Sequence, residues 1–426
     1  MRSTLDDISG TDGEDAPGGP VVVLVAAGGQ PLLRVFDPGD ELVLGRRIGT
    51  FELDDDRVSR DHATVRFDGG AWLVADRSSH NGTFVDGVRV DGELRRRGDC
   101  VVRIGHSILL LVRDGRGYHA APADHGDQII GPELARTYEL VRRQANDRTL
   151  VIHGESGSGK ELVARFYHDI GPRAGGPFVA VNCAAIPEGV AERLLFGARK
   201  GAFSGAHDAT GYLQSAHGGT LFLDEIAELD LAVQPKLLRA LEMREVTPVG
   251  SNAPIEIDIG VVAASHAELR IEVAARRFRE DLYYRLARST VHLPPLRDRK
   301  LDLARLVIRE IAAVDRRLAA HARLIETCCV RPWPGNIREL RGALRIAGIA
   351  ARGAGRDVVR FDDLPESAGL PVADSGAPAA PNGAIDRDAI VAALADAGGV
   401  VSVAARALGL HRTQLYRLIE KHGIER

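Results

Sequence analysis

The sequence predicts three folded parts in series: an all-β sandwich, a larger α/β domain, and an all-α segment at the C-terminal end. Between residues 20 and 113, short apolar or alternating runs are separated by Gly, Asp, Ser and Asn, which is typical of a sandwich. Apolar strands such as TLVIHG, FVAVN and TLFLDE then alternate with long helical patterns, which indicates a parallel sheet covered by helices. The final stretch has a helical pattern throughout.

Composition marks the boundaries between these parts. Residues 1–19 are rich in Asp, Gly and Pro, and we expect them to be disordered. Two stretches poor in apolar residues, 114–127 and 367–383, are expected to be linkers. The predicted domains therefore span residues 20–113, 128–366 (with a helical region from about residue 300 to 366) and 384–426.

Overall composition limits the class of protein. A chain of 426 residues is too long for one hydrophobic core. The formal net charge is only -4, so any contact with DNA must come from a local basic patch. The cysteines lack metal-ligand spacing, which favours a reduced, cytoplasmic protein. We expect no signal peptide and no membrane span, since the longest apolar runs, such as residues 108–112, are too short.

The strongest chemical signal is GESGSGKE, which follows the apolar strand TLVIH and opens a helical pattern. Glycines let backbone N–H groups surround a phosphate, and a helix N-terminus favours negative charge. Lys160 would reach the outer phosphates, whereas Glu161 stands where a P-loop normally has Ser or Thr. A loop that serves only as a turn is the alternative. The predicted phosphate loop comprises Gly154, Glu155, Ser156, Gly157, Ser158, Gly159, Lys160 and Glu161.

A second signal is the strand pattern TLFLDE, which ends in Asp224 and Glu225. Burying two carboxylates is costly unless they have a role. We expect Asp224 to help hold magnesium and Glu225 to activate the water that attacks ATP. The alternative is a strand that ends in a solvated loop.

With these signals in place, residues 129–351 resemble the AAA+ domain of sigma-54-dependent activators, whose phosphate loop also contains GKE. The resemblance implies an α/β AAA+ P-loop ATPase with a helical lid, which uses ATP and magnesium to remodel sigma-54 RNA polymerase. The matching segments occur in family order: GPFVAVNCAAIPE (176–188), LLFGARKGAFSGA (194–206), GGTLFLDEIAELDLAVQPKLLRALE (218–242), RRFREDLYYRL (276–286), LPPLRDR (293–299) and WPGNIREL (333–340).

The resemblance also assigns roles to single residues. Asn182 matches the switch asparagine that holds Glu225. Arg279 and Arg285 match arginine fingers that reach the ATP of a neighbouring subunit, which implies a homo-oligomer, usually a hexamer. Arg338 matches the sensor arginine of the lid. Each arginine alone would more often be a solvated surface charge.

The segment GAFSGA matches the loop that engages sigma-54 in the relatives. Small residues make a mobile tip that would expose one aromatic side chain to the partner. A surface loop with a buried phenylalanine is the alternative. The sequence departs from the family at Ser204, usually Thr, and at His266, usually Asn. The predicted contact loop comprises Gly201, Ala202, Phe203, Ser204, Gly205 and Ala206.

The front domain resembles a forkhead-associated (FHA) domain through LGR (44–46), SRDH (59–62) and SSHNGTFVDG (78–87). A phosphate dianion is best held by arginine and hydroxyl groups. His62 is expected to brace the site, and His80 stands where the family usually has Thr. A sandwich that only docks onto the ATPase ring is the alternative. The residues implied to bind a phosphothreonine protein or peptide are Arg46, Ser59, Arg60 and Asn81.

Residues 384–426 resemble the Fis-type helix-turn-helix that ends these activators. Its second helix would enter the major groove of double-stranded DNA. A helical hairpin used only for dimerisation is the alternative. The residues expected to face DNA are His411, Arg412, Gln414 and Arg417.

Together these resemblances imply an activator of sigma-54 RNA polymerase that binds upstream DNA and responds to a phosphothreonine protein, the product of a Ser/Thr kinase. Two other classes stay open: a DNA-binding regulator that works with another sigma factor, and a phospho-dependent adaptor.

Overall fold

The computed structural model of the chain describes residues 18–27, 30–37, 41–46, 51–119, 128–187, 189–202, 207–371 and 390. The chain divides into two compact units, residues 1–371 and 372–426. Several predicted functional residues lie outside the described residues: Phe203, Ser204, Gly205 and Ala206 of the contact loop, and His411, Arg412, Gln414 and Arg417 of the helix-turn-helix.

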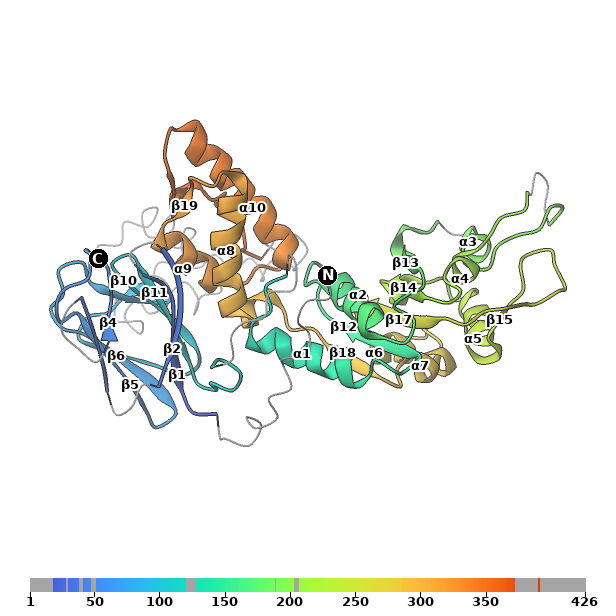
Figure 1. The fold of residues 1–426 in the computed structure, drawn as a ribbon, viewed down its shortest axis with the longest axis horizontal. Coiled ribbons are helices and arrows are strands. Elements are labelled where there is room, and N and C mark those ends of the chain that lie inside the picture. The colour runs from blue at the N-terminus through green and yellow to red at the C-terminus, as the bar shows by residue number, and fades with distance from the viewer. Residues whose placement is uncertain are drawn as a thin grey trace. The chain divides into compact units, whose positions relative to one another are not determined.

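The front of the first unit is a sandwich of two sheets, as the sequence predicts (Figure 1). One sheet has the order β2-β1-β11-β10-β7-β8 and the other β4-β3-β5-β6-β9. Trp72 and Leu44 lie in the core between them. The strands are β1 (Val21–Ala27), β2 (Gln30–Phe36), β3 (Leu42–Gly45), β4 (Phe51–Glu52), β5 (Ala63–Asp68), β6 (Ala71–Asp76), β7 (Thr83–Val85), β8 (Val88–Arg89), β9 (Glu93–Arg96), β10 (Cys100–Ile104) and β11 (Ser107–Val112).

The α/β domain that follows is built on a parallel five-stranded sheet of order β13-β14-β17-β12-β18. Helices α1 and α2 share a core with one face of this sheet, and α3, α5, α6 and α7 share a core with the other. The strands are β12 (Thr149–His153), β13 (Phe178–Asn182), β14 (Thr220–Asp224), β17 (Gly260–Ser265) and β18 (Thr290–His292). The helices are α1 (Pro132–Arg143), α2 (Lys160–Ile170), α3 (Ala191–Phe196), α4 (Tyr212–Ser215), α5 (Gln234–Met243), α6 (Leu269–Ala274) and α7 (Glu280–Leu286).

Short elements complete this domain. Strands β15 (Glu245–Val246) and β16 (Ile255–Glu256) form an antiparallel pair beside α5. Three short 3₁₀-helices follow strand ends or precede the lid: η1 (Cys183–Ala185), η2 (Ile226–Glu228) and η3 (Leu296–Asp298). The carboxyl ends of β12, β13, β14 and β17 meet at one edge of the sheet, which is where ligands bind in open α/β folds.

The helical lid consists of α8 (Lys300–Val314), α9 (Ala322–Val330) and α10 (Asn336–Gly353). A short parallel pair, β19 (Ala319–Ala320) with β20 (Val358–Val359), and η4 (Phe361–Asp363) complete it. The Trp333 side chain is fully buried, and its indole N–H donates to Cys328 O at 2.7 Å. This bond fixes the turn between α9 and α10, which carries the WPGN sequence.

Two predicted linkers begin inside packed structure. The Tyr118 ring is buried and its hydroxyl donates to Glu133 on α1. At the far end of the lid, Gly369 N–H donates to Glu339 Oε1 at 2.7 Å, and Ala368 is buried. Each segment has a buried side chain and a hydrogen bond to a neighbouring helix, so the packed structure extends into residues 114–119 and 367–371.

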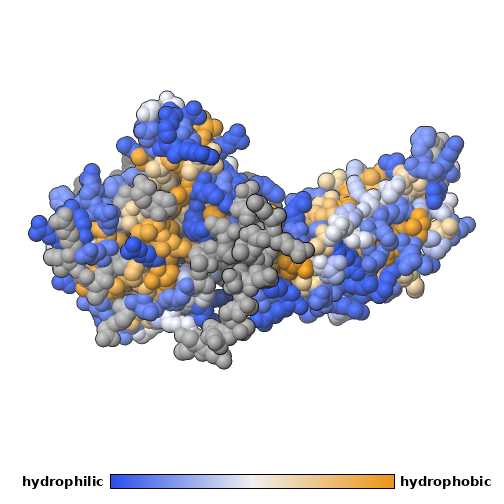
Figure 2. All heavy atoms as spheres, viewed as in Figure 1, coloured by the Kyte–Doolittle hydropathy of each residue, from blue (hydrophilic) through white to orange (hydrophobic). Residues whose placement is uncertain are grey.

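Polar residues cover most of the face shown in Figure 2, and apolar residues are visible over the sandwich and the lid and, in smaller areas, over the α/β domain. Within the described part of the chain, every helix is too short or too polar to cross a membrane.

Candidate nucleotide-binding site

The predicted phosphate loop connects β12 to α2, which begins at Lys160. Gly157 and Gly159 have φ angles of 73° and 108°, a region that residues with a Cβ rarely occupy. A Cβ on Gly157 would lie 2.5 Å from Gly335 O of the lid, so a side chain there is excluded twice over. The loop therefore has the shape of a backbone cradle that a phosphate group can fill.

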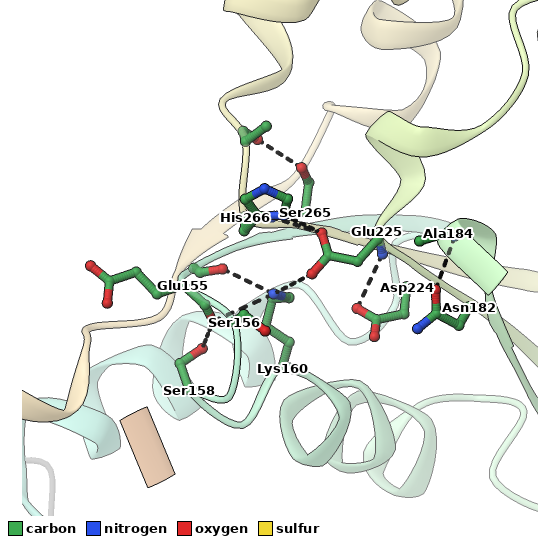
Figure 3. Close-up of polar contacts among 12 residues, drawn as sticks. Glu155, Ser156, Ser158, Lys160, Asn182, Ala184, Asp224, Glu225, Ser265 and His266 are labelled. Carbon is green, nitrogen blue, oxygen red and sulfur yellow. Dashed lines mark hydrogen bonds and ion pairs between the residues drawn. The ribbon is translucent and has the colours of Figure 1, made fainter. Parts of the chain in front are cut away.

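The Lys160 ammonium group points back into this cradle (Figure 3). It donates to Gly154 O at 3.0 Å and to Glu225 Oε1 at 3.2 Å. The side chain is only 6% exposed. A buried ammonium group held by one carboxylate and by carbonyl oxygens can exchange these partners for phosphate oxygens when nucleotide binds.

Asp224 and Glu225 lie at the end of β14, opposite the phosphate loop (Figure 3). Burial raises the pKa of Asp224, although the charge of Lys160 opposes this. Burial acts in the same sense on Glu225, but hydrogen bonds from His266 and the charge of Lys160 outweigh it, so the pKa of Glu225 is lowered. The Glu225 carboxylate is thus held as an anion, which is the form that a general base requires.

The predicted contact between Asn182 and Glu225 is not the one that this structure forms. Asn182 Oδ1 accepts a hydrogen bond from Ala184 N–H at 3.0 Å and so caps η1. Glu225 Oε2 instead lies 2.6 Å from His266 Nδ1 and accepts a bond from the His266 N–H at 3.2 Å. Asn182 nevertheless pairs in register with Asp224 on the neighbouring strand, so it lies beside the carboxylates.

The lid closes one side of the phosphate loop. Arg338 Nη1 donates to Ser156 Oγ at 3.3 Å, so the predicted sensor arginine lies beside the phosphate loop. Asn336, which the sequence argument did not single out, is fully buried and donates to both Glu155 Oε2 and Ser156 O at 3.0 Å. Asn336 adopts a φ of 51°, and Asn is one of the few residues with a Cβ that tolerates this region. Its place in the GNIREL motif was the available signal.

Two arginines of the LPPLRDR segment were also missed. Arg297 forms an ion pair with Glu155 at 2.7 Å, and this hydrogen bond lowers the pKa of Glu155. Arg299 is almost fully buried and donates to Ser158 O at 3.0 Å. These residues attach the start of the lid to the phosphate loop.

The two predicted arginine fingers lie on α7 and at its N-terminus. Arg279 is exposed and pairs with Asp281 at 2.7 Å. Arg285 donates to Leu241 O at 2.8 Å and is partly buried. Neither residue takes part in the hydrogen bonds found around the described phosphate loop of its own chain.

Magnesium fits the donor set at the end of β14. Magnesium in nucleotide sites is usually held by one or two carboxylates together with phosphate oxygens. Asp224 supplies such a carboxylate, half-buried and across from the phosphate cradle. Within the described residues there is no cluster of three or more His, Cys, Asp or Glu side chains that would hold a metal alone. Any ion here would therefore be shared with the nucleotide.

The predicted phosphothreonine residues lie on three neighbouring loops of the sandwich. Arg46 N–H donates to Ser59 O at 3.0 Å, and His80 N–H donates to Ser59 Oγ at 3.1 Å. Asn81 Nδ2 donates to Arg57 O at 2.7 Å, and Arg60 is exposed. The loops are thus connected to one another, with charged side chains at their tips.

His62 supports these loops from below. It is fully buried, accepts from Ser59 N–H through Nδ1 at 2.9 Å, and lies 3.3 Å from Gly82 O through Nε2. Burial lowers its pKa, so the imidazole is neutral with the proton on Nε2. This geometry agrees with a bracing role.

Comparison with known proteins agrees with these features. Residues 130–292 match the model of the sigma-54 interaction domain, residues 42–105 the FHA domain, and residues 383–422 the Fis family of bacterial regulatory proteins. The structure of NtrX from Brucella abortus in complex with ATP is 30% identical, has a TM-score of 0.52, and covers 70% of each chain. The fold and the site thus define a AAA+ P-loop ATPase domain of the sigma-54 interaction class.

Curated relatives extend the match. The transcriptional regulatory protein ZraR of Klebsiella oxytoca is 42% identical over 305 residues, which are 68% of this chain and 67% of that protein. The Nif-specific regulatory protein of Azotobacter vinelandii is 40% identical over 308 residues, 68% of this chain and 58% of that protein. The response regulator protein FleR of Pseudomonas aeruginosa is 44% identical over 251 residues, 57% of this chain and 53% of that protein. The chain belongs to the family of sigma-54-dependent transcriptional regulators, and it combines an FHA domain, the ATPase domain and a Fis-type helix-turn-helix in that order. It spans between about half and two thirds of the length of these three relatives.

Proposed function

We propose that this protein activates transcription by sigma-54 RNA polymerase and that ATP hydrolysis drives the remodelling of the closed promoter complex. The observation that carries the proposal is the facing arrangement of Lys160, Asp224 and Glu225 across the phosphate loop. A vestigial ATPase would have no need to keep a buried ammonium group and two half-buried carboxylates in this geometry, since such groups are costly when unused.

The residues at this site divide the chemistry between them. Lys160 and the loop N–H groups bind the phosphates, and Asp224 holds magnesium, which neutralises charge on the phosphoryl group when it is bound. Glu225 accepts the proton of the attacking water. Arg338 senses the nucleotide from the lid, close to Ser156.

Hydrolysis is proposed to need a neighbouring subunit. Arg279 bonds to Asp281 and Arg285 bonds to Leu241 O, so neither is engaged with the phosphate loop of its own chain. Arginine is suited to bind phosphate oxygens in trans because it keeps its charge and offers several donors. The active form is therefore a ring, a hexamer by analogy with the family. Residues 201–206 would contact sigma-54 in the ATP state.

The FHA domain and the helix-turn-helix are proposed to receive the regulatory signal and to select the DNA site, respectively. Arg46, Ser59, Arg60 and Asn81 are proposed to bind a phosphothreonine protein or peptide that a Ser/Thr kinase produces. His411, Arg412, Gln414 and Arg417 are proposed to bind upstream DNA. In sequence order, the domain proposed to receive the phosphorylation signal precedes the ATPase domain, and the domain proposed to select the promoter follows it.

Turnover assays with two matched variants test the motor directly. Glu225→Gln removes the base without changing size, and Glu228→Gln makes the same change at an exposed residue three positions further on. We expect Glu225→Gln to lose about 100-fold or more in kcat and Glu228→Gln to keep it. Equal turnover in the two variants would remove Glu225 from the mechanism and favour a regulator whose ATPase domain only assembles the ring.

A further inference from the structure

The sheet β2-β1-β11-β10-β7-β8 is covered on both faces, whereas a sheet in a two-sheet sandwich usually has one face exposed to solvent. Every residue of β1 and β11 is buried. Alternate residues point to different cores. One set lies in the sandwich core: Val22, Leu24, Leu109 and Leu111. The other set lies in a core shared with the lid: Val21, Val23, Val25, Ile108, Leu110 and Val112.

The lid elements that cover this second face are α8 and α9. Helix α9 contacts both β10 and β11, and α8 contacts β1 (Figure 1). Leu301, Leu324 and Cys328 are among the lid residues in the shared core. The apolar face of the sandwich is therefore matched to an apolar face of the lid, and neither is left to solvent.

A buried carboxylate fixes the register between the two faces. Glu326 on α9 has a side chain only 3% exposed. Its Oε2 accepts a hydrogen bond from Arg103 Nε at 2.6 Å, and its Oε1 accepts one from Gly87 N–H at 3.0 Å. The Arg103 guanidinium also lies 3.9 Å from the centre of the Phe84 ring. We call Gly87, Arg103 and Glu326 the clamp.

The clamp is specific because both partners of the carboxylate come from the sandwich. A buried charge that loses its partner is strongly destabilising, whereas apolar contact alone tolerates sliding. A second contact, from Lys300 Nζ to Asp99 O at 2.9 Å, joins the start of α8 to the β9–β10 turn.

The same lid is attached to the phosphate loop at its other end. The turn after α9 leads to Asn336 and Arg338, which bond to Glu155 and Ser156. A change in lid position thus reaches the nucleotide site directly.

The sandwich side of the clamp is attached to the phosphothreonine loops through Asp55, which is 2% exposed. Asp55 Oδ2 accepts from Ser107 Oγ and from His106 N–H, both at 2.7 Å, at the turn between β10 and β11. Its Oδ1 accepts from Arg57 N–H at 3.0 Å, and Arg57 O binds Asn81. One buried carboxylate therefore joins the loop before Ser59 to the strands that touch the lid.

We propose that the β1–β10–β11 face is a docking surface for the lid of the same chain, and that the clamp couples the phosphothreonine loops to nucleotide affinity. The second half rests on the proposed phosphothreonine recognition. By thermodynamic linkage, if phosphopeptide binding changes the affinity for nucleotide by some factor, nucleotide binding changes the affinity for the phosphopeptide by the same factor.

The docking half is tested by charge reversal in the full chain. Arg103→Glu should weaken ADP binding about fivefold, the lower end of typical coupling between sites, and speed amide hydrogen exchange across α9. The double variant Arg103→Glu with Glu326→Arg should recover both in part, because the ion pair is formed again with its charges exchanged whereas Gly87 N–H loses its acceptor. Arg66→Glu reverses a charge in an exposed pair with Glu93 of the same sandwich and should change neither.

The outcomes separate the two halves. If Arg103→Glu has the same amide exchange rates in α9 and the same ADP affinity as the wild type, the docking surface is overturned. If amide exchange in α9 is faster but the ADP affinity is unchanged, the coupling is overturned.

A degenerate peptide pool with a fixed phosphothreonine, compared with the same pool carrying threonine, tests the loops. It should shift the ADP affinity of the wild type but not of Arg103→Glu. A pool that binds without a shift contradicts the coupling. A pool that does not bind contradicts the proposed phosphothreonine site and with it the second half, while the charge reversal still decides the docking.

Discussion

At the scale of single residues, the position of Glu225 depends on a histidine. The ring and the backbone N–H of His266 both bond to Glu225 Oε2. Lys160 holds the other oxygen at 3.2 Å. In this arrangement Glu225 bonds to His266, directly after β17, and not to Asn182, so His266 acts as a positioning residue for the proposed base.

Replacing His266 tests this positioning role. His266→Ala should lower kcat about tenfold, less than loss of the base itself, with little change in KM for ATP, because phosphate binding does not involve the imidazole. His266→Asn, whose amide can donate the same bond, should stay within about threefold of the wild type. Wild-type kcat in His266→Ala would show that Glu225 needs no support from this strand.

A second residue, Asp302, should make stability depend on pH. It is 1% exposed, and burial raises its pKa to about 7, with Arg299 only partly opposing this. The folded protein therefore keeps a proton that the unfolded chain releases above about pH 4, so stability falls as pH rises from there to about 7.

Asp302→Asn removes this titration. The difference in Tm, variant minus wild type, should become more positive between pH 5 and pH 8, by about 2–4 °C for each kcal/mol involved. A difference that stays constant over this range would show that the Asp302 carboxyl titrates normally.

At the scale of elements, the backbone conformation at Gly157 both shapes the phosphate cradle and allows the lid to approach closely. Gly157→Ala places a methyl group 2.5 Å from Gly335 O and requires a φ that alanine rarely adopts. We expect ATP affinity to fall at least tenfold, because both the cradle and the closed lid must shift. Gly175→Ala, which meets nothing within 4 Å and lies in a surface turn of the same domain, is the control and should bind ATP normally.

Strands β1 and β11 allow a matched test of the two-sided sheet. Leu110 faces the lid and Leu111 faces the sandwich core. Each substitution to Ala should cost about 2–5 kcal/mol of stability. Only Leu110→Ala should also speed hydrogen exchange in α9, which is measured by mass spectrometry. Equal exchange in α9 for both variants would contradict the shared core.

The sequences of these two strands also contain a signal for their surroundings that local patterns of other segments do not. The all-β and α/β patterns, the phosphate loop and the paired carboxylates were predicted from local signals, and the predicted fold class is confirmed. The runs VVVLVAA and SILLLV lack the alternation of a sheet with one wet face, and that was the signal for a second covered face. The contacts of Asn182, His266 and Asn336 could not be predicted, because hydrogen-bond partners depend on where separate strands and the lid come together.

At the scale of the whole molecule, the described part of the chain centres on the lid. Through Asn336 it touches the phosphate loop, and through Glu326 it is fixed to the sandwich. Docking of the sandwich and phosphothreonine recognition by the sandwich are therefore compatible. Docking is the means by which a signal at the phosphothreonine loops would reach the ATP site. The helix-turn-helix and the residues 203–206 would then deliver the result to DNA and polymerase.

The central claim is tested most directly by open-complex formation on a sigma-54 promoter with purified sigma-54 polymerase, followed by permanganate reactivity of the melted bases. The account predicts opening that requires ATP, is lost by about 100-fold or more in Glu225→Gln, and persists in Glu228→Gln. Opening without ATP, or undiminished in Glu225→Gln, would contradict it. So would a wild-type ring that hydrolyses ATP and opens nothing, and the regulator of another polymerase form would then be the better account.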